Sequence, residues 1–243
     1  MSELSNYIDE YLKTEYTLKS TLKDSVQSSV YLYQKNDSAK QIVKISQKNR
    51  NDHVLRRLRG QLNKNTATIY EVCSNDEDVT VLEEYISGAT LGHIVEVNGG
   101  TLKRELAVKY ALDICNGLVF IHSLGIIHRD IKPSNIIITE QGEAVIIDFG
   151  IARLTDDSKY ADTKNLGTAG YAAPEQFGIY QSGPVTDIYA VGVLLNELLL
   201  GVHPTIDTPK GKLGKVINKC IMAQMSKRYQ TVSELAEVLN KLL

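Results

Sequence analysis

The spacing of apolar and polar residues separates a strand-rich first part of the chain from a helix-rich remainder. Residues 2–15 have a helical pattern, and residues 16–86 contain short strand-like runs around one further helical stretch. The remainder predicts helices over residues 102–123, 186–200, 212–224 and 231–242, and two short strands over 135–138 and 144–147. The expected fold is α+β with two lobes: a small β-rich lobe over 16–86, preceded by a helical extension over 1–15, and a larger helical lobe over 87–243.

Two of the predicted helices have an apolar face that can be named residue by residue. In the helix at 102–123, this face consists of Ala107, Ala111, Ile114, Leu118 and Ile121. In the helical stretch of the small lobe, residues 49–62, it consists of Val54, Leu55, Leu58 and Leu62.

Composition narrows the class of protein. The chain has 243 residues, of which 43% are hydrophobic, so it can bury one substantial core spread over two lobes. Its net charge is −2, and it has no basic run, which argues against a nucleic-acid partner.

The sequence also favours a cytoplasmic protein. Cys73, Cys115 and Cys220 form no CxxC pair and no metal-ligand spacing, so buried, reduced thiols are expected. No apolar segment approaches the ~18 charge-free residues of a membrane span, and the polar N-terminus is unlike a signal peptide. We expect either a free-standing minimal domain or a domain excised from a longer chain.

One segment carries most of the chemical information. Residues 128–150 read HRDIKPSNIIITEQGEAVIIDFG, in which an H-R-D-x-K-x-x-N pattern is followed by Asp148-Phe149-Gly150. Together these motifs closely resemble those of the eukaryotic-like protein kinases (the bacterial, Hanks-type kinases) in their serine/threonine branch. The resemblance extends over residues 16–243 and implies the two-lobed protein kinase fold.

The resemblance implies a role for each polar residue of this segment. Asp130 would accept a hydrogen bond from the attacking hydroxyl and take its proton, and Lys132 would face the γ-phosphate. Asn135 and Asp148 would hold Mg²⁺, a cation that prefers oxygen ligands. His128 is expected to support the loop by packing.

Further motifs of the same family follow in the expected order. Residues 167–175, GTAGYAAPE, resemble the end of an activation segment, in which Thr168 would bind the catalytic Asp and Lys. The resemblance also implies that Asp187 holds the backbone of the HRD motif and that Arg228 pairs with Glu175. A buried Arg–carboxylate pair costs ~3–5 kcal/mol to break on one side, so these residues favour the fold more than the activity.

The segment expected to cover the phosphates departs from the family. When Val30 is aligned with the strand after this loop, Lys23, Ser25 and Ser28 stand at the family's glycine positions, and residues 22–30 contain no glycine. A Cβ atom hinders the close approach of backbone N–H groups to phosphate. Two interpretations stay open: the serine hydroxyls supply compensating donors, or the segment is a plain β-hairpin with no phosphate role.

A second nucleotide-binding segment is predicted over residues 41–45. It fits the family's V-A-I-K strand, in which Lys44 would bridge the α- and β-phosphates; otherwise Lys44 is an ordinary surface lysine. Strand alternation puts Ile42 on the same face as Lys44, where the family has a small Ala beside the adenine ring, so a tight pocket is expected. The complete set of ATP contacts that the resemblance implies is Ser25, Ser28, Val30, Ile42, Lys44, the hinge residues Glu84 and Ile86, and Asn135.

The family's glutamate partner of this lysine is missing. No Glu occurs between Lys35 and Tyr70. Asp52 is one substitute, although its side chain is short and it comes early, and Glu83, at the gatekeeper position before the hinge, is the other. We hypothesise a Lys44–Glu83 ion pair; the alternative is that Glu83 only binds backbone groups in a tightened core.

Phosphorylation of the activation segment, residues 148–175, is a further expectation. Arg129 lies next to Asp130 and marks the kind of kinase that is often switched on when a phosphate in this segment pairs with it. Thr163 is the preferred site; a threonine in such a loop is otherwise simply solvated.

Two functions are compatible with these observations, and a third is disfavoured. The first is MgATP-dependent transfer of the γ-phosphoryl group to Ser/Thr hydroxyls of proteins, including autophosphorylation. The second is a pseudokinase that acts as a nucleotide-binding or scaffolding module, which the missing glycines and the missing helix Glu favour. A small-molecule kinase of related fold is disfavoured by the GTAGYAAPE segment, which in the family holds an extended peptide. The sequence indicates neither the substrate protein nor the oligomeric state.

Overall fold

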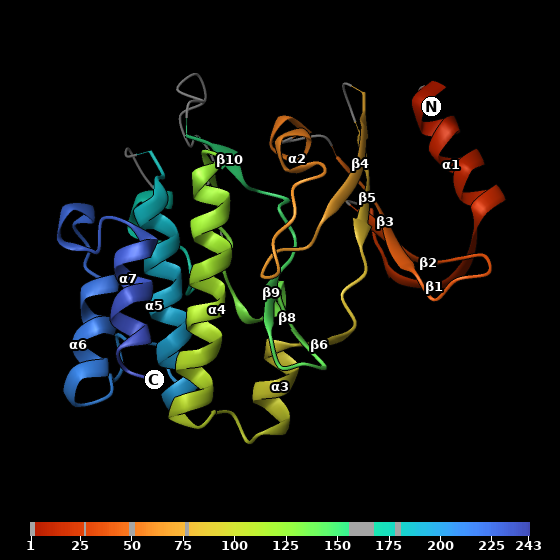
Figure 1. Ribbon diagram of the computed structural model, residues 1–243. Helices are drawn as coiled ribbons and strands as arrows, with labels where there is room; N and C mark the ends of the chain where they lie inside the picture. Colours follow the sequence, from red (N-terminus) through yellow and green to blue (C-terminus); the bar gives the residue numbers. More distant parts are fainter. Residues whose placement is uncertain (1–2, 27, 49–51, 76–77, 156–167, 178–180) are drawn as a thin grey trace. The chain divides into compact units, whose positions relative to one another are not determined.

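The chain divides into two compact units, each with its own core. The computed structural model describes residues 3–26, 28–48, 52–75, 78–155, 168–177 and 181–243 (Figure 1). The smaller unit consists of Met1–Asn63 and Ala67–Ile86, and the larger unit of Lys64–Thr66 and Ser87–Leu243. None of the helices in the described ranges has both the length and the apolar character needed to span a bilayer.

The smaller unit is built on an antiparallel sheet of five strands in the order β1-β2-β3-β5-β4. The strands are β1 (Tyr16–Asp24), β2 (Ser28–Lys35), β3 (Gln41–Lys48), β4 (Ile69–Ser74) and β5 (Asp78–Glu84). Two helices, α1 (Glu3–Glu15) and α2 (Asp52–Leu58), pack on this sheet. The central strand β3 is therefore paired on both sides, by β2 and by β5.

The two helices lie on opposite faces of this sheet (Figure 1). Cys73 of β4 packs in a buried cluster with Ile8 and Leu12 of α1. The next residue, Ser74, donates a hydrogen bond to Asp52 of α2 at 2.8 Å. Because successive side chains of a strand point to opposite faces, α1 covers one face and α2 the other.

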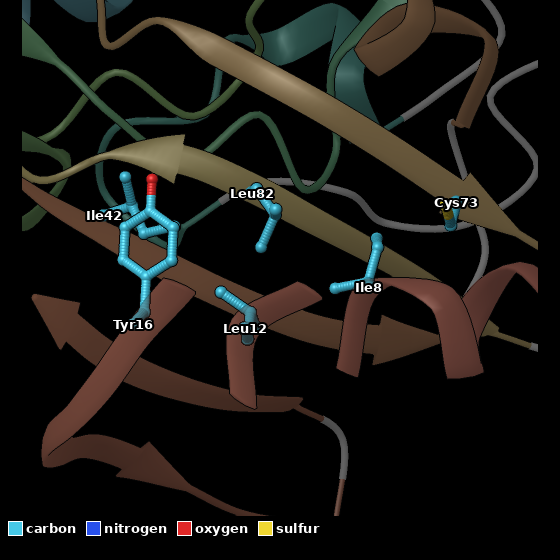
Figure 2. Close-up of a cluster of buried hydrophobic side chains, with 6 residues drawn as sticks. All are labelled: Ile8, Leu12, Tyr16, Ile42, Cys73 and Leu82. Atoms are coloured by element: carbon cyan, nitrogen blue, oxygen red, sulfur yellow. The ribbon is translucent and has the colours of Figure 1, made fainter. Parts of the chain in front are cut away.

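The face that α1 covers is sealed by apolar side chains. Figure 2 shows Ile8 and Leu12 of α1 beside Ile42 of β3 and Leu82 of β5. These four side chains are all buried, and Tyr16 at the start of β1 completes the cluster. The helical extension expected at residues 1–15 is thus part of the core of the smaller unit.

The helix predicted over residues 49–62 is shorter at its C-terminal end than expected. Val54, Leu55 and Leu58 are buried in α2, but Leu62 is 77% exposed, so its inclusion in the apolar face was wrong. The chain leaves the helix at Gly60, which has a φ of 74° and donates its N–H to Ile69 O at 2.8 Å. Glycine accepts this left-handed conformation without a Cβ clash, and residues 49–51 lie outside the described ranges.

The larger unit is mainly helical. Its helices are α3 (Leu91–Val97), α4 (Arg104–Ser123), α5 (Pro184–Leu200), α6 (Gly211–Cys220) and α7 (Val232–Asn240). Its strands form two small sheets, one of β6 (Gly88–Thr90), β8 (Ile136–Thr139) and β9 (Ala144–Ile146), the other of β7 (Ile126–Ile127) and β10 (Arg153–Leu154). Among the described residues of this unit, single 3₁₀ turns occur at Pro133–Asn135, Pro174–Phe177 and Met225–Lys227.

Helix α4 is the centre of the larger unit. It packs against α5, α7 and β9, and its predicted apolar face is confirmed. The five residues of that face, Ala107, Ala111, Ile114, Leu118 and Ile121, are all fully buried.

The helix predicted over residues 212–224 ends earlier, at Cys220. The carbonyl of Met222 accepts a hydrogen bond from Arg228 Nε at 2.8 Å, and the carbonyl of Ala223 accepts one from Arg228 Nη2 at 3.4 Å. A buried guanidinium needs acceptors for its N–H groups. The chain supplies them by turning out of the helix before these two residues.

A glycine in α6 provides a test of packing in the larger unit. A Cβ atom at Gly214 would lie 1.7 Å from Pro209 O, whereas a Cβ atom at Gly92 in α3 would make an ordinary contact, 3.6 Å from Pro133 Cβ. Gly214→Ala should therefore destabilise the unit by about 1–3 kcal/mol. Gly92→Ala should be neutral or slightly stabilising, because Ala favours helix. Urea unfolding of both variants gives the comparison; equal midpoints would contradict it.

Candidate active site

A β-hairpin in the larger unit positions Asn135 and Asp148, which are 13 residues apart in the sequence. In the hairpin of β8 and β9, Ile136 pairs with Ile146. The N–H of Ile147 then donates to the carbonyl of Asn135 at 2.9 Å. Asp148, the next residue, therefore follows directly on the strand that pairs with the segment of Asn135.

Three side chains of the larger unit form a closed ring of polar contacts. Lys132 Nζ lies 2.7 Å from Asp130 Oδ2 and donates to Thr168 Oγ1 at 2.7 Å. The Thr168 hydroxyl donates in turn to Asp130 Oδ1 at 2.7 Å. Both carboxylate oxygens of Asp130 are thus held by defined donors, which fixes the orientation of the carboxylate. The contact of Thr168 with both residues is the one expected from the sequence.

The ring also determines the charge of Asp130. Burial works to raise the pKa of this carboxyl, but the hydrogen bonds from Lys132 and Thr168 outweigh it and hold the pKa below its usual range. Asp130 is therefore a carboxylate at neutral pH.

Asn135 is oriented by the same carboxylate. Its Nδ2 donates to Asp130 O at 3.0 Å and to Asp130 Oδ2 at 2.8 Å. Because the amide nitrogen is used in this way, the amide oxygen, 3.5 Å from Ser134 Oγ, is the atom that could bind a cation. Asp148 is exposed, with one oxygen accepting from Gly150 N at 3.0 Å.

Asn135 and Asp148 suit a magnesium ion better than a metal ion whose ligands all come from the protein. Within the described ranges, no three His, Cys, Asp or Glu side chains gather closely enough to hold a metal ion. Mg²⁺ keeps several waters and commonly takes one or two protein ligands together with substrate phosphates. An amide oxygen and one exposed carboxylate match that requirement.

The backbone that carries Asp130 is fixed by a fully buried carboxylate. Asp187 accepts from His128 N at 3.0 Å and from Arg129 N at 2.8 Å. His122 Nε2 lies 2.7 Å from the same side chain. Burial works to raise the pKa of Asp187, but the contact with His122 lowers it below the usual range. The predicted role of Asp187 in holding the HRD backbone agrees with these contacts.

Arg129 is held in a conformation that is uncommon for a residue with a Cβ. Its φ is 67°, its Nε donates to Ile151 O at 2.8 Å, and its carbonyl accepts from Gln176 Nε2 at 3.0 Å. Thr163, the phosphorylation site expected to pair with Arg129, lies outside the described residues.

The predicted pairing of Glu175 with Arg228 is present. Arg228 Nη1 and Nη2 donate to Glu175 Oε1 and Oε2 at 2.7 and 2.8 Å, a two-pronged contact in which both residues are buried. Thr186 donates a further hydrogen bond to Glu175 at 2.9 Å. This pair anchors the segment after Thr168 to the helical core.

In the smaller unit, Lys44 has a different partner from the one hypothesised. Lys44 Nζ lies 2.5 Å from Asp9 Oδ1 of α1. In the register of β3 and β5, Val43 stands opposite Glu83 and Lys44 opposite Leu82. Glu83 therefore lies on the other face of the sheet, and the Lys44–Glu83 hypothesis was wrong.

The other substitute, Asp52, also lies on that other face. Its Oδ2 accepts from Arg56 Nε at 3.2 Å and from Ser74 Oγ at 2.8 Å. Neither of the two acidic residues considered from the sequence is thus on the face of Lys44, and the carboxylate comes from the helical extension instead.

The register also separates the residues expected to bind ATP. Ile42 pairs with Glu84 on the face of Lys44, whereas Val30 pairs with Ile45 on the opposite face. Ser28 lies on the face of Val30, because the two residues are separated by one position in β2. The predicted ATP contacts of the smaller unit therefore lie on both faces of the sheet, Ile42 and Lys44 on one and Ser28 and Val30 on the other.

The remaining predicted contacts flank the sheet. Ser25 Oγ donates to Ser28 O at 2.9 Å and accepts from Ser28 N at 3.1 Å, so this hydroxyl closes the turn between β1 and β2. That use favours the plain β-hairpin. Glu84 accepts from Thr68 N at 3.2 Å, and Ile86 is the last residue of the smaller unit.

Three contributing residues were missed from the sequence: Asp9, His122 and Gln176. Gln176 directly follows the A-P-E motif, and its buried side chain joins that segment to Arg129. Asp9 lies next to Ile8 on the helical pattern of the first 15 residues. No sequence signal distinguishes His122 from an ordinary residue near the end of α4.

Comparisons with known proteins agree with the geometry of this site. The pattern of the protein kinase domain matches residues 14–243. A probable serine/threonine-protein kinase of Clostridium perfringens is 32% identical over 223 residues, covering 79% of this chain and 32% of that protein. The serine/threonine-protein kinase PknB of Mycolicibacterium smegmatis is 33% identical over 181 residues, covering 64% and 29%. The chain thus spans about a third of the length of these curated relatives.

The buried pair of Glu175 and Arg228 gives a stability prediction. Glu175→Gln leaves a buried guanidinium without its counter-charge, so the free energy of unfolding should fall by about 3–5 kcal/mol. The matched control is Glu143→Gln, which removes one partner of the largely exposed Lys64–Glu143 pair at 3.4 Å; its effect should stay below about 1 kcal/mol. Urea denaturation measures both, and a similar loss in the two variants would contradict the prediction.

Proposed function

The chain belongs to the protein kinase family, in its serine/threonine branch, and from this premise we propose that it transfers the γ-phosphoryl group of MgATP to Ser and Thr hydroxyls of proteins, itself included. The observation that carries the proposal is the ring of Asp130, Lys132 and Thr168. A scaffolding module needs none of these contacts, so the ring favours an active enzyme over a pseudokinase.

Asp130 is the proposed base. As a carboxylate it accepts a hydrogen bond from the substrate hydroxyl and takes its proton as the new oxygen–phosphorus bond forms and the bond to the β-phosphate oxygen breaks. Lys132, beside it at 2.7 Å, places a cation where charge on the transferred group can be stabilised. Thr168 holds both groups in this arrangement.

Asn135 and Asp148 are the proposed ligands of Mg²⁺. The amide oxygen of Asn135 is the atom proposed to bind the ion, because the amide nitrogen donates to Asp130. When bound, the ion would supply positive charge that neutralises part of the charge of the phosphates.

For the nucleotide we propose contacts from residues of the smaller unit. Lys44 would bind the phosphates, Ile42 the base, and Glu84 and Ile86 of the hinge segment its edge. The hydroxyl of Ser25 is already used within its turn, so no phosphate contact is proposed for it.

The setting of the reaction is also a proposal. The substrate is a protein with an accessible Ser or Thr, and the location is the cytoplasm, which agrees with three buried free thiols. Phosphorylation of Thr163 and its pairing with Arg129 is the proposed activating event.

The first test is intact-mass spectrometry after incubation with MgATP. Wild-type protein, dephosphorylated beforehand, should gain phosphate, whereas Asp130→Asn should gain none, because the amide cannot accept the proton. Peptide mapping of the product then tests Thr163. Wild-type protein that is folded and gains no phosphate would favour the pseudokinase.

The contribution of the Thr168 hydroxyl can be separated from that of the side-chain volume. Thr168→Val keeps the volume but removes the hydroxyl that holds Asp130 and Lys132, so kcat should fall roughly 10- to 100-fold with little change in the KM for ATP. Thr168→Ser keeps the hydroxyl and should retain most of the activity. Steady-state kinetics on a protein substrate checks both, and equal kcat values for the two variants would exclude the ring as the means of positioning.

A further inference from the structure

The segment from Thr208 to Ser233 carries charges of one sign only. It contains neither Asp nor Glu, and its six basic residues are Lys210, Lys212, Lys215, Lys219, Lys227 and Arg228. The whole chain has a net charge of −2 and this basic segment has +6, so the rest of the chain has −8. Such a separation of charge gives one part of the surface a positive potential, which attracts an anionic partner.

Three of these lysines gather on one face of α6. Lys212, Lys215 and Lys219 are spaced three and four residues apart, so they are neighbours along the helix, and all three are exposed. The other face, which includes Leu213 and Ile217, is buried, and α6 packs against α5 (Figure 1). We call the three exposed residues the lysine face.

The charges of the lysine face are not neutralised by the part of the chain that the structure describes. No residue of that part forms an ion pair with Lys212, Lys215 or Lys219. Lys219 Nζ lies 4.0 Å from the centroid of the Tyr229 ring, a contact that orients the ammonium group without cancelling its charge. The three ammonium groups are therefore available to a partner with negative charge.

The chain on both sides of α6 is fastened to the segment that carries Thr168. In the connection between α5 and α6, His203 Nε2 lies 2.9 Å from the carbonyl oxygen of Gly170, two residues after Thr168. Beyond α6, Arg228 pairs with Glu175 at the end of the same segment. The lysine face is thus held at a fixed place relative to the ring that contains Thr168.

We propose that the lysine face of α6 binds an acidic segment of the protein substrate, apart from the Ser or Thr that accepts the phosphate. The proposal rests on the proposed function, which makes a protein the substrate. At a rise of about 1.5 Å per residue, the lysine face spans about 10 Å along the helix. An extended peptide rises about 3.3 Å per residue, so a stretch of about four residues rich in Asp and Glu covers this length. The preferred substrates are proteins that carry such a stretch near the accepting hydroxyl.

An anionic membrane is another surface that exposed lysines could contact. A helix that lies in a membrane interface buries its apolar face among the lipids. The apolar side chains of α6 are buried within the larger unit, so only its lysines could contact a bilayer. The contacts that fasten α6 to the segment of Thr168 favour the protein substrate, and the experiment below includes vesicles.

The affinity of the full chain for a fluorescein-labelled octapeptide of glutamate, measured by fluorescence anisotropy, tests the proposal directly. The triple variant Lys212→Gln, Lys215→Gln, Lys219→Gln should raise the Kd about 10-fold, because each exposed ion pair changes an equilibrium constant about two- to threefold. The matched control makes the same change of charge at three exposed lysines outside the basic segment and should leave the Kd within about twofold; these are Lys13, Lys19 and Lys103.

Three results of this measurement would overturn the proposal. The first is a wild type that does not bind the peptide at low salt, where exposed charges are least screened. The second is an equal rise of the Kd in both triple variants, which would reflect net charge alone. The third is binding to phosphatidylglycerol vesicles that the α6 variant loses while its affinity for the peptide stays that of the wild type, which would assign the lysine face to a membrane.

Phosphate transfer gives the second test. The acceptor is the Asp130→Asn chain that also has the three α6 substitutions, so that its own lysine face cannot bind the tail, and it is made with and without a C-terminal tail of eight glutamates. The wild-type enzyme should have the lower KM for the acceptor with the tail, and the α6 triple variant should lose about 10-fold of this preference. Equal KM values for the two acceptors, in wild type that transfers phosphate, would overturn the inference and leave the proposed function intact. Folded wild type that binds the glutamate peptide but transfers no phosphate would contradict the proposed function, and the site would then be a docking site without a substrate.

Discussion

The carboxylate of Asp187 fixes the backbone on which the chemistry of the larger unit depends. It accepts the N–H groups of His128 and Arg129, and so holds Arg129 at a φ of 67°. A non-glycine residue in this region costs about 1–3 kcal/mol and persists only where its surroundings over-determine it. Here the surroundings do so, since Ile151 and Gln176 bind the side chain and the carbonyl of the same residue. Asp130 is the next residue, and its direction is set by this strained neighbour.

In the smaller unit, the corresponding constraint is strand alternation. A lysine in a central strand can form an ion pair only with an acidic residue on the face to which its side chain points. Lys44 points to the face of α1, so Asp9 can reach it, and Asp52 and Glu83 on the other face cannot. A glutamate in α2 would also lie on the face away from Lys44. The absence of an acidic partner in α2 is therefore consistent with this sheet and does not leave the lysine uncompensated.

How far the sequence predicted these arrangements depends on the range of the interaction. The contacts among Asp130, Lys132 and Thr168 and between Glu175 and Arg228 were predicted because each residue belongs to a motif with fixed spacing. The partner of Lys44 was not, because it depends on the register of two strand pairs and on which face a preceding helix covers. A shift of one residue in such a register exchanges the two faces, and no local pattern reports it. The end of α2 could not be predicted for a related reason: Leu62 continues the apolar repeat, but the chain turns at Gly60 to pair with Ile69.

The two units also differ in how firmly their charged groups are held. Asp187, Glu175 and Arg228 are buried with several partners each, and breaking such an arrangement on one side costs ~3–5 kcal/mol. The Asp9–Lys44 pair is partly exposed, with side-chain exposures of 35% and 14%, and Asp9 sits on a helix of 13 residues. Isolated helices of that length are marginal in water, so the position of α1 depends on its contacts with the sheet.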